Sequence, residues 1–155
     1  MLSSIKLYRK EVYNMAILVV YWTGTGNTEV IAENIYDGIL SAGVEADLKQ
    51  IDDILPQDVL NYEKVCIGCP SMGIEELEPD EFLPWYEELE PRLGQMPVLL
   101  FGSYGWGEGE WMDYWEQRVY EVGLNLFEKG IKIASIPSRQ ESEEIKEIAK
   151  RFALS

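Results

Sequence analysis

The sequence predicts an α/β fold in which helices cover both faces of a parallel β-sheet. Five short apolar segments alternate with stretches of helical spacing along the chain. Strands that alternate with helices are joined by crossover connections, which makes neighbouring strands parallel. A chain of 155 residues is long enough for one domain around a single core. We therefore expect a three-layer sandwich built on a five-stranded parallel sheet.

The expected strands differ in how apolar they are. The first, third and fourth read as continuous apolar runs, which is typical of central strands that are buried on both faces. The second is more polar and suits an edge of the sheet. The five strands are expected at residues 16–21, 45–49, 64–69, 97–102 and 131–136.

The connecting segments show apolar residues at helical spacing. Ile31 and Ile35 begin one such stripe, and Trp111 and Trp115 begin another. Further helices are expected around residues 82–89, with a proline near the start where it is tolerated, and around 145–152. A short helix or turn is expected between residues 52 and 62.

The first fourteen residues differ in composition from the rest. They carry Lys6, Arg9 and Lys10 against a single acid, Glu11, and contain no apolar core of the signal-peptide type. Met15 follows directly before the first expected strand. We expect residues 1–14 to be a leader, a tag or an upstream start, and the sequence does not decide among these. Residues 15–155 are expected to form a single domain.

The chain is strongly acidic, with a formal net charge of −15. The charge is concentrated in residues 70–121, which hold 13 acidic and two basic residues. Nucleic-acid binding needs clustered lysine and arginine and is therefore not expected. No apolar run approaches the roughly 20 residues that span a bilayer, so no membrane contact is expected. A field of this sign favours the basic faces of protein partners and salt-sensitive encounters.

Histidine is absent, which removes Ser-His and Cys-His catalysis and the commonest metal ligand. The only cysteines, Cys66 and Cys69, form a C-x-x-C spacing within an expected buried strand. Strand residues three apart point to opposite faces, so the two thiols are poorly placed to pair. We expect two reduced core cysteines, which suits a cytoplasmic protein.

A loop rich in glycine and hydroxyl groups follows the first strand and precedes a helix. Such a turn offers free backbone N–H groups at the positive end of the helix dipole, which is a site for phosphate. The nearest downstream lysine is Lys49, so the loop is not a Walker loop. Glu29 stands where a dinucleotide fingerprint needs its last glycine. From this loop alone, a monophosphate site and a simple capped turn both remain open. Its residues are Thr23, Gly24, Thr25, Gly26, Asn27 and Thr28.

Two further loops, after the third and fourth strands, carry exposed apolar side chains. Trp106 lies between Gly105 and Gly107, and Met72 is flanked by loop residues. A tryptophan and a polarizable thioether can form the two walls around a planar ring. The other interpretation is that these side chains cover an edge of the core. The carboxyl ends of parallel strands meet at one edge of the sheet, so the three loops are expected to converge there.

Three stretches together, "YWTGTGNTE", "GCPSMGIEELE" and "FGSYGWGEGEWMD", resemble the short-chain bacterial flavodoxins. The resemblance runs from about Met15 to the C-terminus. It implies a flavodoxin-like fold with strand order 2-1-3-4-5 and FMN bound at the first and third strands. It further implies a monomeric, cytoplasmic one-electron carrier, not an enzyme, working between semiquinone and hydroquinone at low potential.

The resemblance also assigns roles to individual residues. Met72 and Trp106 would sandwich the isoalloxazine ring, Glu75 would accept its N3–H, and Gly105 would offer a backbone N–H to the pyrimidine end. The Gly73 carbonyl would turn to accept the protonated N5, in a type II′ turn that requires a positive φ at this glycine. Ile74 departs from the small or polar residues commoner in relatives, and it is stiffer. The phosphate would be bound by residues 23–28 with Ser103, and the rest of the FMN site would be Ser71, Tyr104 and Gly107.

Two other functions use the same fold. An FMN-dependent NAD(P)H:quinone reductase needs a second pocket beside the flavin, and the short chain and acidic rim argue against it. A phosphoacceptor signalling module without cofactor needs an acidic pocket at the end of the first strand, where residues 23–28 supply none. The sequence does not identify the electron donor, the acceptor or the midpoint potentials.

Overall fold

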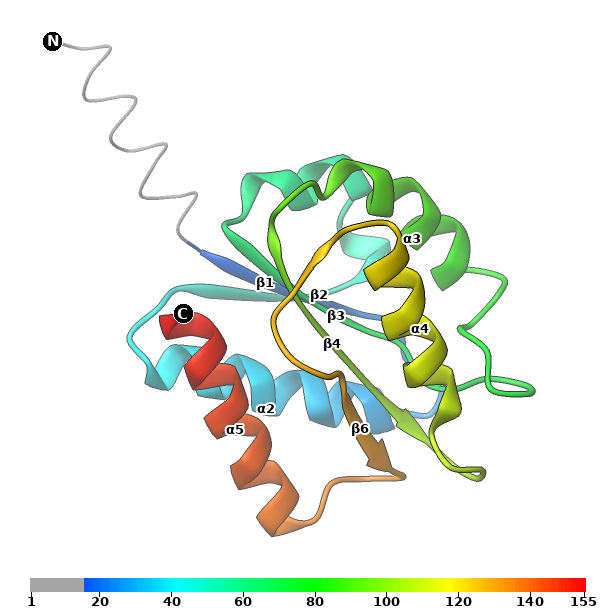
Figure 1. Cartoon of the computed structure of the whole chain (residues 1–155). Helices are drawn as coiled ribbons and strands as arrows, with labels where there is room; N and C mark the ends of the chain where they lie inside the picture. Colours follow the sequence, from blue (N-terminus) through cyan, green and yellow to red (C-terminus); the bar gives the residue numbers. More distant parts are fainter. Residues whose placement is uncertain (1–15) are drawn as a thin grey trace, which may run out of the picture.

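The computed structural model describes residues 16–155, and it has the predicted parallel sheet between two helical layers (Figure 1). The predicted segment 1–14 lies outside the described residues. The strand order is β2-β1-β3-β4-β5, as expected. Every pairing in the sheet is parallel. The first four strands are β1 (Ile17–Tyr21), β2 (Ala46–Gln50), β3 (Lys64–Gly68) and β4 (Pro97–Tyr104).

The fifth position of the sheet differs from the prediction, because two short strands share it. β5 (Asn125–Leu126) pairs with the start of β4, and β6 (Ile131–Ala134) pairs with its end. The Phe127 N–H still donates to the Val98 carbonyl (2.9 Å), and the chain then leaves the edge over residues 128–130 before β6 begins. The sequence predicted a single strand over 131–136, so β5 was missed and the second piece was predicted two residues too long.

The two helical layers cover opposite faces of the sheet (Figure 1). On one face α2 (Asn27–Ser41) packs against α5 (Arg139–Leu154), which begins at a Ser138 capping box. On the other face lie α3 (Phe82–Leu89) and α4 (Glu110–Glu121). The apolar stripes predicted for these helices are buried, including Ile31, Ile35, Trp111 and Trp115.

The connection from β2 to β3 contains only short 3₁₀ turns, as the sequence suggested. These are η1 (Ile51–Asp53) and η2 (Pro56–Asn61); a third, η3 (Glu90–Arg92), follows α3. β2 pairs with β1 and lies at the end of the strand order, so it is the predicted polar edge strand.

Two apolar clusters form the core, one on each side of the sheet. The central strands β1 and β3 are buried at every residue, which explains their uninterrupted apolar sequences. Cys66 belongs to the cluster beneath α2 and α5, and Cys69 to the cluster beneath α3 and α4. Both cysteines are free and buried, as predicted from their spacing.

Lys64 begins β3 and is buried although it is charged. Its ammonium donates hydrogen bonds to the carbonyl oxygens of Phe152 (2.8 Å) and Ser155 (2.7 Å). These bonds satisfy carbonyl groups at the end of α5 and hold that helix against the start of β3.

In the part of the chain from residue 16 onward, no helix is long and apolar enough to cross a membrane.

Candidate functional site

Three loops leave the carboxyl ends of β1, β3 and β4, and backbone hydrogen bonds hold their beginnings together. The Trp22 N–H donates to the Gly68 carbonyl (3.0 Å), which ties the first loop to the second. The Ser71 N–H donates to the Ser103 carbonyl (2.9 Å), which ties the second loop to the third. The predicted convergence of the loops at one edge of the sheet is therefore present.

The first loop ends at an N-terminus of α2 that no side chain caps. Gly26 is the N-cap residue, with a φ of 96° that favours glycine. Its N–H donates to the Thr23 hydroxyl (3.0 Å), which closes the loop. A Cβ built on Gly26 would meet nothing within 4 Å, so the space beside this residue is open. This arrangement fits an anion, because uncapped N–H groups and the helix dipole point to the same place.

A buried pair of hydroxyl groups lies behind this helix end. The Oγ1 of Thr28 and the Oγ of Ser103 are 2.8 Å apart, and both side chains are buried. One hydroxyl donates to the other, so this bond uses one of the two protons. Within residues 16–155 no acceptor is found for the second proton. The pair thus keeps one O–H donor available beside the helix end, which again fits an anion.

The second loop is a narrow turn closed by one residue pair. Met72 and Glu76 exchange backbone hydrogen bonds of 2.7 and 2.9 Å, which leaves three residues in the loop between them. Gly73 has the positive φ that the sequence analysis required, at 53°. Glu75 has the same φ of 53°, which was not predicted and is unusual for a residue with a side chain. The turn is therefore wider than the four-residue unit that the sequence suggested.

The second and third loops line one small cavity of about 120 Å³. Trp106 is 77% exposed and Met72 is 36% exposed, although both are large and apolar. Ile74, at the tip of the turn, is 84% exposed. Exposed apolar side chains at the mouth of a cavity are typical of a binding site and not of core packing. The lining residues are Ser71, Met72, Gly73, Ile74, Glu75, Gly105 and Trp106.

The remaining predicted site residues do not line this cavity. Tyr104 is half-buried, and its ring packs against Trp111 with the ring centres 5.7 Å apart. Gly107 lies beside the Glu75 carboxylate, which would be 2.3 Å from a Cβ at that position. The hydrogen bond between Thr28 and Ser103 connects the end of the first loop to β4. The members of that loop are Thr23, Gly24, Thr25, Gly26, Asn27 and Thr28.

Glu75 also makes a contact that the sequence analysis missed. Its Oε2 accepts a hydrogen bond of 2.6 Å from the Trp111 N–H, in the first turn of α4. No side chain of the α4 N-cap, Gly109, can fill this role, so a residue 36 positions earlier does so. A negative carboxylate at this end of the helix is favourable for the helix dipole. The contact joins the second loop to the third, and no local sequence signal could have shown it.

Glu78 holds the end of the second loop in place. Its buried carboxylate accepts three backbone hydrogen bonds, from Asp80 (2.8 Å), Glu81 (2.8 Å) and Phe82 (2.6 Å). Its own N–H donates to the Cys69 sulfur (3.4 Å), which closes the loop at its base. An acid shortly before an apolar helix is a capping signal, and it could have been used to predict this role.

Trp111 connects the end of the third loop to the start of the second loop. Its indole N–H donates to the Cys69 carbonyl (3.1 Å), and its ring is buried. The neighbouring Gly102 allows this approach, because a Cβ there would be 2.1 Å from the same carbonyl oxygen. The floor of the site is therefore rigidly packed, whereas its rim is exposed.

The rim of the site is acidic. Glu76, Glu108 and Glu110 are exposed. Of the two basic residues between positions 70 and 121, Arg118 is held by Glu90 at 3.0 Å, on a partly buried part of α4. Burial raises the pKa of the nearby Cys69 thiol, so this group stays neutral. The charge near the cavity is thus carried by carboxylates.

The strand order and the site at the carboxyl ends of the strands define a doubly wound α/β protein of the kind that binds its ligand where the strand order reverses. The family described as "Flavodoxin" matches residues 19–148, and the chain belongs to this family. It is therefore an electron-transfer protein with a flavin cofactor.

Relatives support this assignment over most of the chain. Flavodoxin from Megasphaera elsdenii is 40% identical over 131 residues, which is 84% of this chain and 96% of that protein. Flavodoxin from Clostridium beijerinckii is 38% identical over 135 residues, 87% of this chain and 97% of that protein. The solution structure of two-electron reduced M. elsdenii flavodoxin superimposes with a TM-score of 0.78, covering 87% of this chain and 98% of that one at 38% identity.

Proposed function

We propose that the protein carries single electrons at low potential with bound FMN, between the one-electron and two-electron reduced forms of the cofactor. The observation that supports this most is the turn at Gly73, which has a positive φ and lies against a cavity bounded by Trp106 and surrounded by carboxylates. When bound, FMN supplies the redox chemistry, and the protein supplies position and electrostatics.

The phosphate of FMN would lie at the uncapped N-terminus of α2. The open space beside Gly26 and the spare proton of the Thr28–Ser103 pair support this placement. The negative phosphate would be stabilised by backbone N–H groups and the helix dipole, without a cation. Thr23, Gly24, Thr25 and Asn27 are proposed to complete this part of the site.

The ring would lie in the cavity between the second and third loops, with Met72 and Trp106 as its walls. Glu75 has one carboxylate oxygen on the Trp111 N–H, which leaves Oε1 to accept a ring N–H. Gly105 offers its backbone N–H from the opposite loop. Ser71, Ile74, Tyr104 and Gly107 are proposed as the surrounding residues.

The peptide after Gly73 would respond to the protonation of the ring. A residue at positive φ without a side chain lets a peptide rotate at low cost, so the Gly73 carbonyl can turn to accept a proton-bearing nitrogen. Ile74 follows it and is 84% exposed, so its side chain is free of packing that would block the rotation.

The acidic rim would lower the potential at which the last electron is accepted. Between residues 70 and 121 the chain has eleven net negative charges, which raise the free energy of an added negative charge. A penalty of about 1.4 kcal/mol corresponds to roughly 60 mV for one electron. Burial between two apolar walls disfavours an anion further.

Partners are proposed to dock with basic faces against this rim, and the protein to act as a monomeric cytoplasmic carrier without substrate turnover of its own. The exposed carboxylates Glu76, Glu108 and Glu110 support the docking, which should weaken with added salt. The two reduced, buried cysteines suit a cytoplasmic location. A single domain over residues 15–155 agrees with the length of the relatives, which the chain covers almost completely.

Stepwise anaerobic reduction of the flavin-loaded protein with dithionite, followed by visible absorption, tests the proposal. We expect two well-separated one-electron steps and a blue one-electron-reduced form at the midpoint. Direct two-electron reduction without this form would instead favour a hydride-transfer reductase. A protein that binds no added FMN would contradict the proposed site as a whole.

A further inference from the structure

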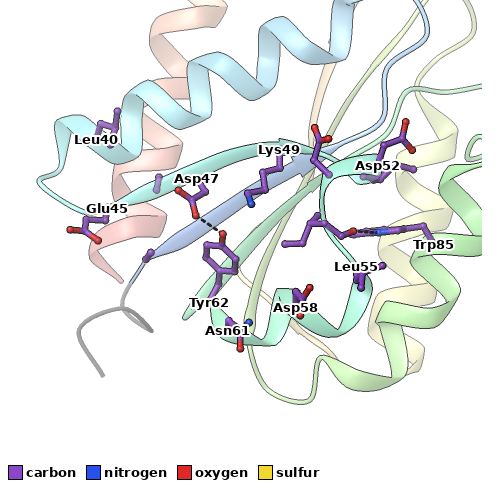
Figure 2. A pocket seen from close by; sticks show the side chains of 15 residues that line it. Leu40, Glu45, Asp47, Lys49, Asp52, Leu55, Asp58, Asn61, Tyr62 and Trp85 are labelled. Carbon is purple, nitrogen blue, oxygen red and sulfur yellow. Dashed lines mark hydrogen bonds between the residues drawn. The ribbon is translucent and has the colours of Figure 1, made fainter. Parts of the chain in front are cut away.

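A second cavity, larger than the one at the flavin site, lies elsewhere on the molecule. It is an open groove of about 800 Å³ beside the edge strand β2, and it extends over the turns η1 and η2 (Figure 2). Its lining comes from β2 and the residues just before β1 and β2, from the β2–β3 connection, from Leu40 on α2 and from Trp85 on α3. None of the residues assigned above to FMN binding lines it.

The groove exists because no long helix covers this side of β2. The 3₁₀ turns that follow β2 are short, and α3 packs against η2. The floor and walls therefore keep apolar side chains in contact with solvent. Leu55 is 59% exposed and Leu40 is 44% exposed, while the Trp85 indole N–H is held by the Ile54 carbonyl at 2.9 Å.

The groove is also acidic. Five carboxylates line it against one cation, Lys49. The Tyr62 hydroxyl donates a hydrogen bond to one of them, Asp47. The other four form no salt bridge with any residue from position 16 onward. An occupant with basic and apolar side chains would complement both properties of the groove. The five carboxylates are Glu45, Asp47, Asp52, Asp53 and Asp58.

The chain enters the described structure at the wall of this groove. Ala16 is one of its lining residues. The Ala16 carbonyl accepts a hydrogen bond from the Glu63 N–H (3.0 Å), and the next residue, Ile17, donates to the Glu45 carbonyl (2.9 Å). These bonds fix the position of Ala16, to which residues 1–15 are attached.

Those fifteen residues have the composition that the groove requires. They carry three basic residues and one acidic residue, whereas residues 16–155 are strongly acidic. Among the basic residues they place Leu2, Ile5, Leu7, Val12 and Tyr13. Residues 125–139 have a similar balance of charge and apolar residues, but they form β5, β6 and the start of α5 and are already part of the fold.

We propose that residues 1–15 bind in the groove beside β2 of their own chain, with their basic side chains against its carboxylates and their apolar side chains against Leu40 and Leu55. Because the segment is attached at the groove wall, its effective concentration there is in the millimolar range. Weak contacts are therefore sufficient for occupancy. The segment would supply the apolar cover that the β2–β3 connection lacks.

Cross-linking of paired cysteines in the full-length chain tests this placement. The native thiols are fully buried, so only engineered cysteines react with a short bismaleimide. The test variant combines Val12→Cys with Leu55→Cys in the groove. Leu154→Cys replaces Leu55→Cys in the control, because Leu154 is similarly exposed, at 63%. It also lies near the start of β1, since Lys64 pairs with Ile17 and binds Ser155.

We expect intramolecular cross-linking at Leu55→Cys to be about tenfold faster than at Leu154→Cys. Attachment alone brings the segment near both positions, whereas binding in the groove would hold Val12→Cys beside Leu55→Cys. Equal rates at both positions would contradict the proposal. Cross-linked dimers in place of monomers would show that a second copy occupies the groove, which would also overturn it.

A charge test separates specific binding from proximity. The triple variant Asp52→Asn, Asp53→Asn and Asp58→Asn should reduce the preference for the groove severalfold, and added salt should do the same. The matched control removes three exposed carboxylates of α5, with Glu143→Gln, Glu144→Gln and Glu147→Gln. If both triple variants had the same effect, overall charge and not the groove would hold the segment, and the proposal would fail.

Discussion

The hydroxyl pair of Thr28 and Ser103 allows stability and cofactor binding to be separated in one set of variants. Thr28→Val keeps the shape of a fully buried side chain but removes its hydroxyl. The Ser103 hydroxyl, only 4% exposed, would then lose its partner 2.8 Å away. An unsatisfied buried hydroxyl costs about 1–3 kcal/mol, so we expect Thr28→Val to lower the free energy of unfolding by about 2 kcal/mol.

The double variant Thr28→Val with Ser103→Ala should recover most of this loss, because no unpaired hydroxyl remains. Urea unfolding of the flavin-free wild type, both single variants and the double variant measures the coupling, which we expect to be about 1–2 kcal/mol. Costs that simply add in the double variant would refute the reasoning, since they would mean that the two hydroxyls act independently.

In the double variant, the FMN affinity should fall although the stability recovers. If the spare proton of the pair binds the phosphate, the double variant has no hydroxyl left to donate this hydrogen bond. Its Kd for FMN should rise about tenfold, corresponding to about 1.4 kcal/mol, although its stability is nearly normal. A double variant that binds FMN as tightly as the wild type would remove both hydroxyls from the proposed phosphate site.

Three further predictions concern other parts of the molecule. Glu75→Gln should destabilise the flavin-free protein by about 0.5–1 kcal/mol in urea unfolding. The variant loses the negative charge at the start of α4, while its side chain can still accept the hydrogen bond from the Trp111 N–H. An unchanged free energy of unfolding would mean that this charge is screened. Gly73→Ala should cost about 1–2 kcal/mol, because a Cβ disfavours its φ of 53°, and should lower the yield of the one-electron-reduced flavin in a redox titration; an unchanged yield would exclude the proposed peptide rotation. Burial raises the pKa of Cys66 and Cys69 in the folded protein, so unfolding should become easier as the pH rises through about 8.5, where the thiols of the unfolded chain ionise. The variant with alanine at both positions should lack this part of the pH dependence, and an identical pH profile would contradict the assignment.

Periodicity and composition predicted most of the fold, because they report burial directly. The apolar runs of β1 and β3 and the polar β2 identified central and edge strands, and the C-x-x-C spacing placed the two thiols in different clusters. The split of the last strand into β5 and β6 was missed, because a two-residue strand is too short to show any periodicity in the sequence.

The three loops of the site were recognisable from their residue types, and their convergence followed from the parallel sheet. The contacts between them were not predictable. The bond from Glu75 to Trp111 spans 36 positions, and the positive φ of Glu75 results from the closure of the turn by Met72 and Glu76. Such contacts depend on the distance between loops in space, which a single sequence does not contain.

The position of one cysteine under each helical layer has a consequence for how the protein opens. A thiol that is fully buried reacts only when the layer above it separates from the sheet, so its labelling rate measures the free energy of that local opening. Cys66 reports on the layer of α2 and α5, and Cys69 reports on the layer of α3 and α4. The chain therefore contains two natural probes, and comparing their labelling rates would show which of the two helical layers detaches first.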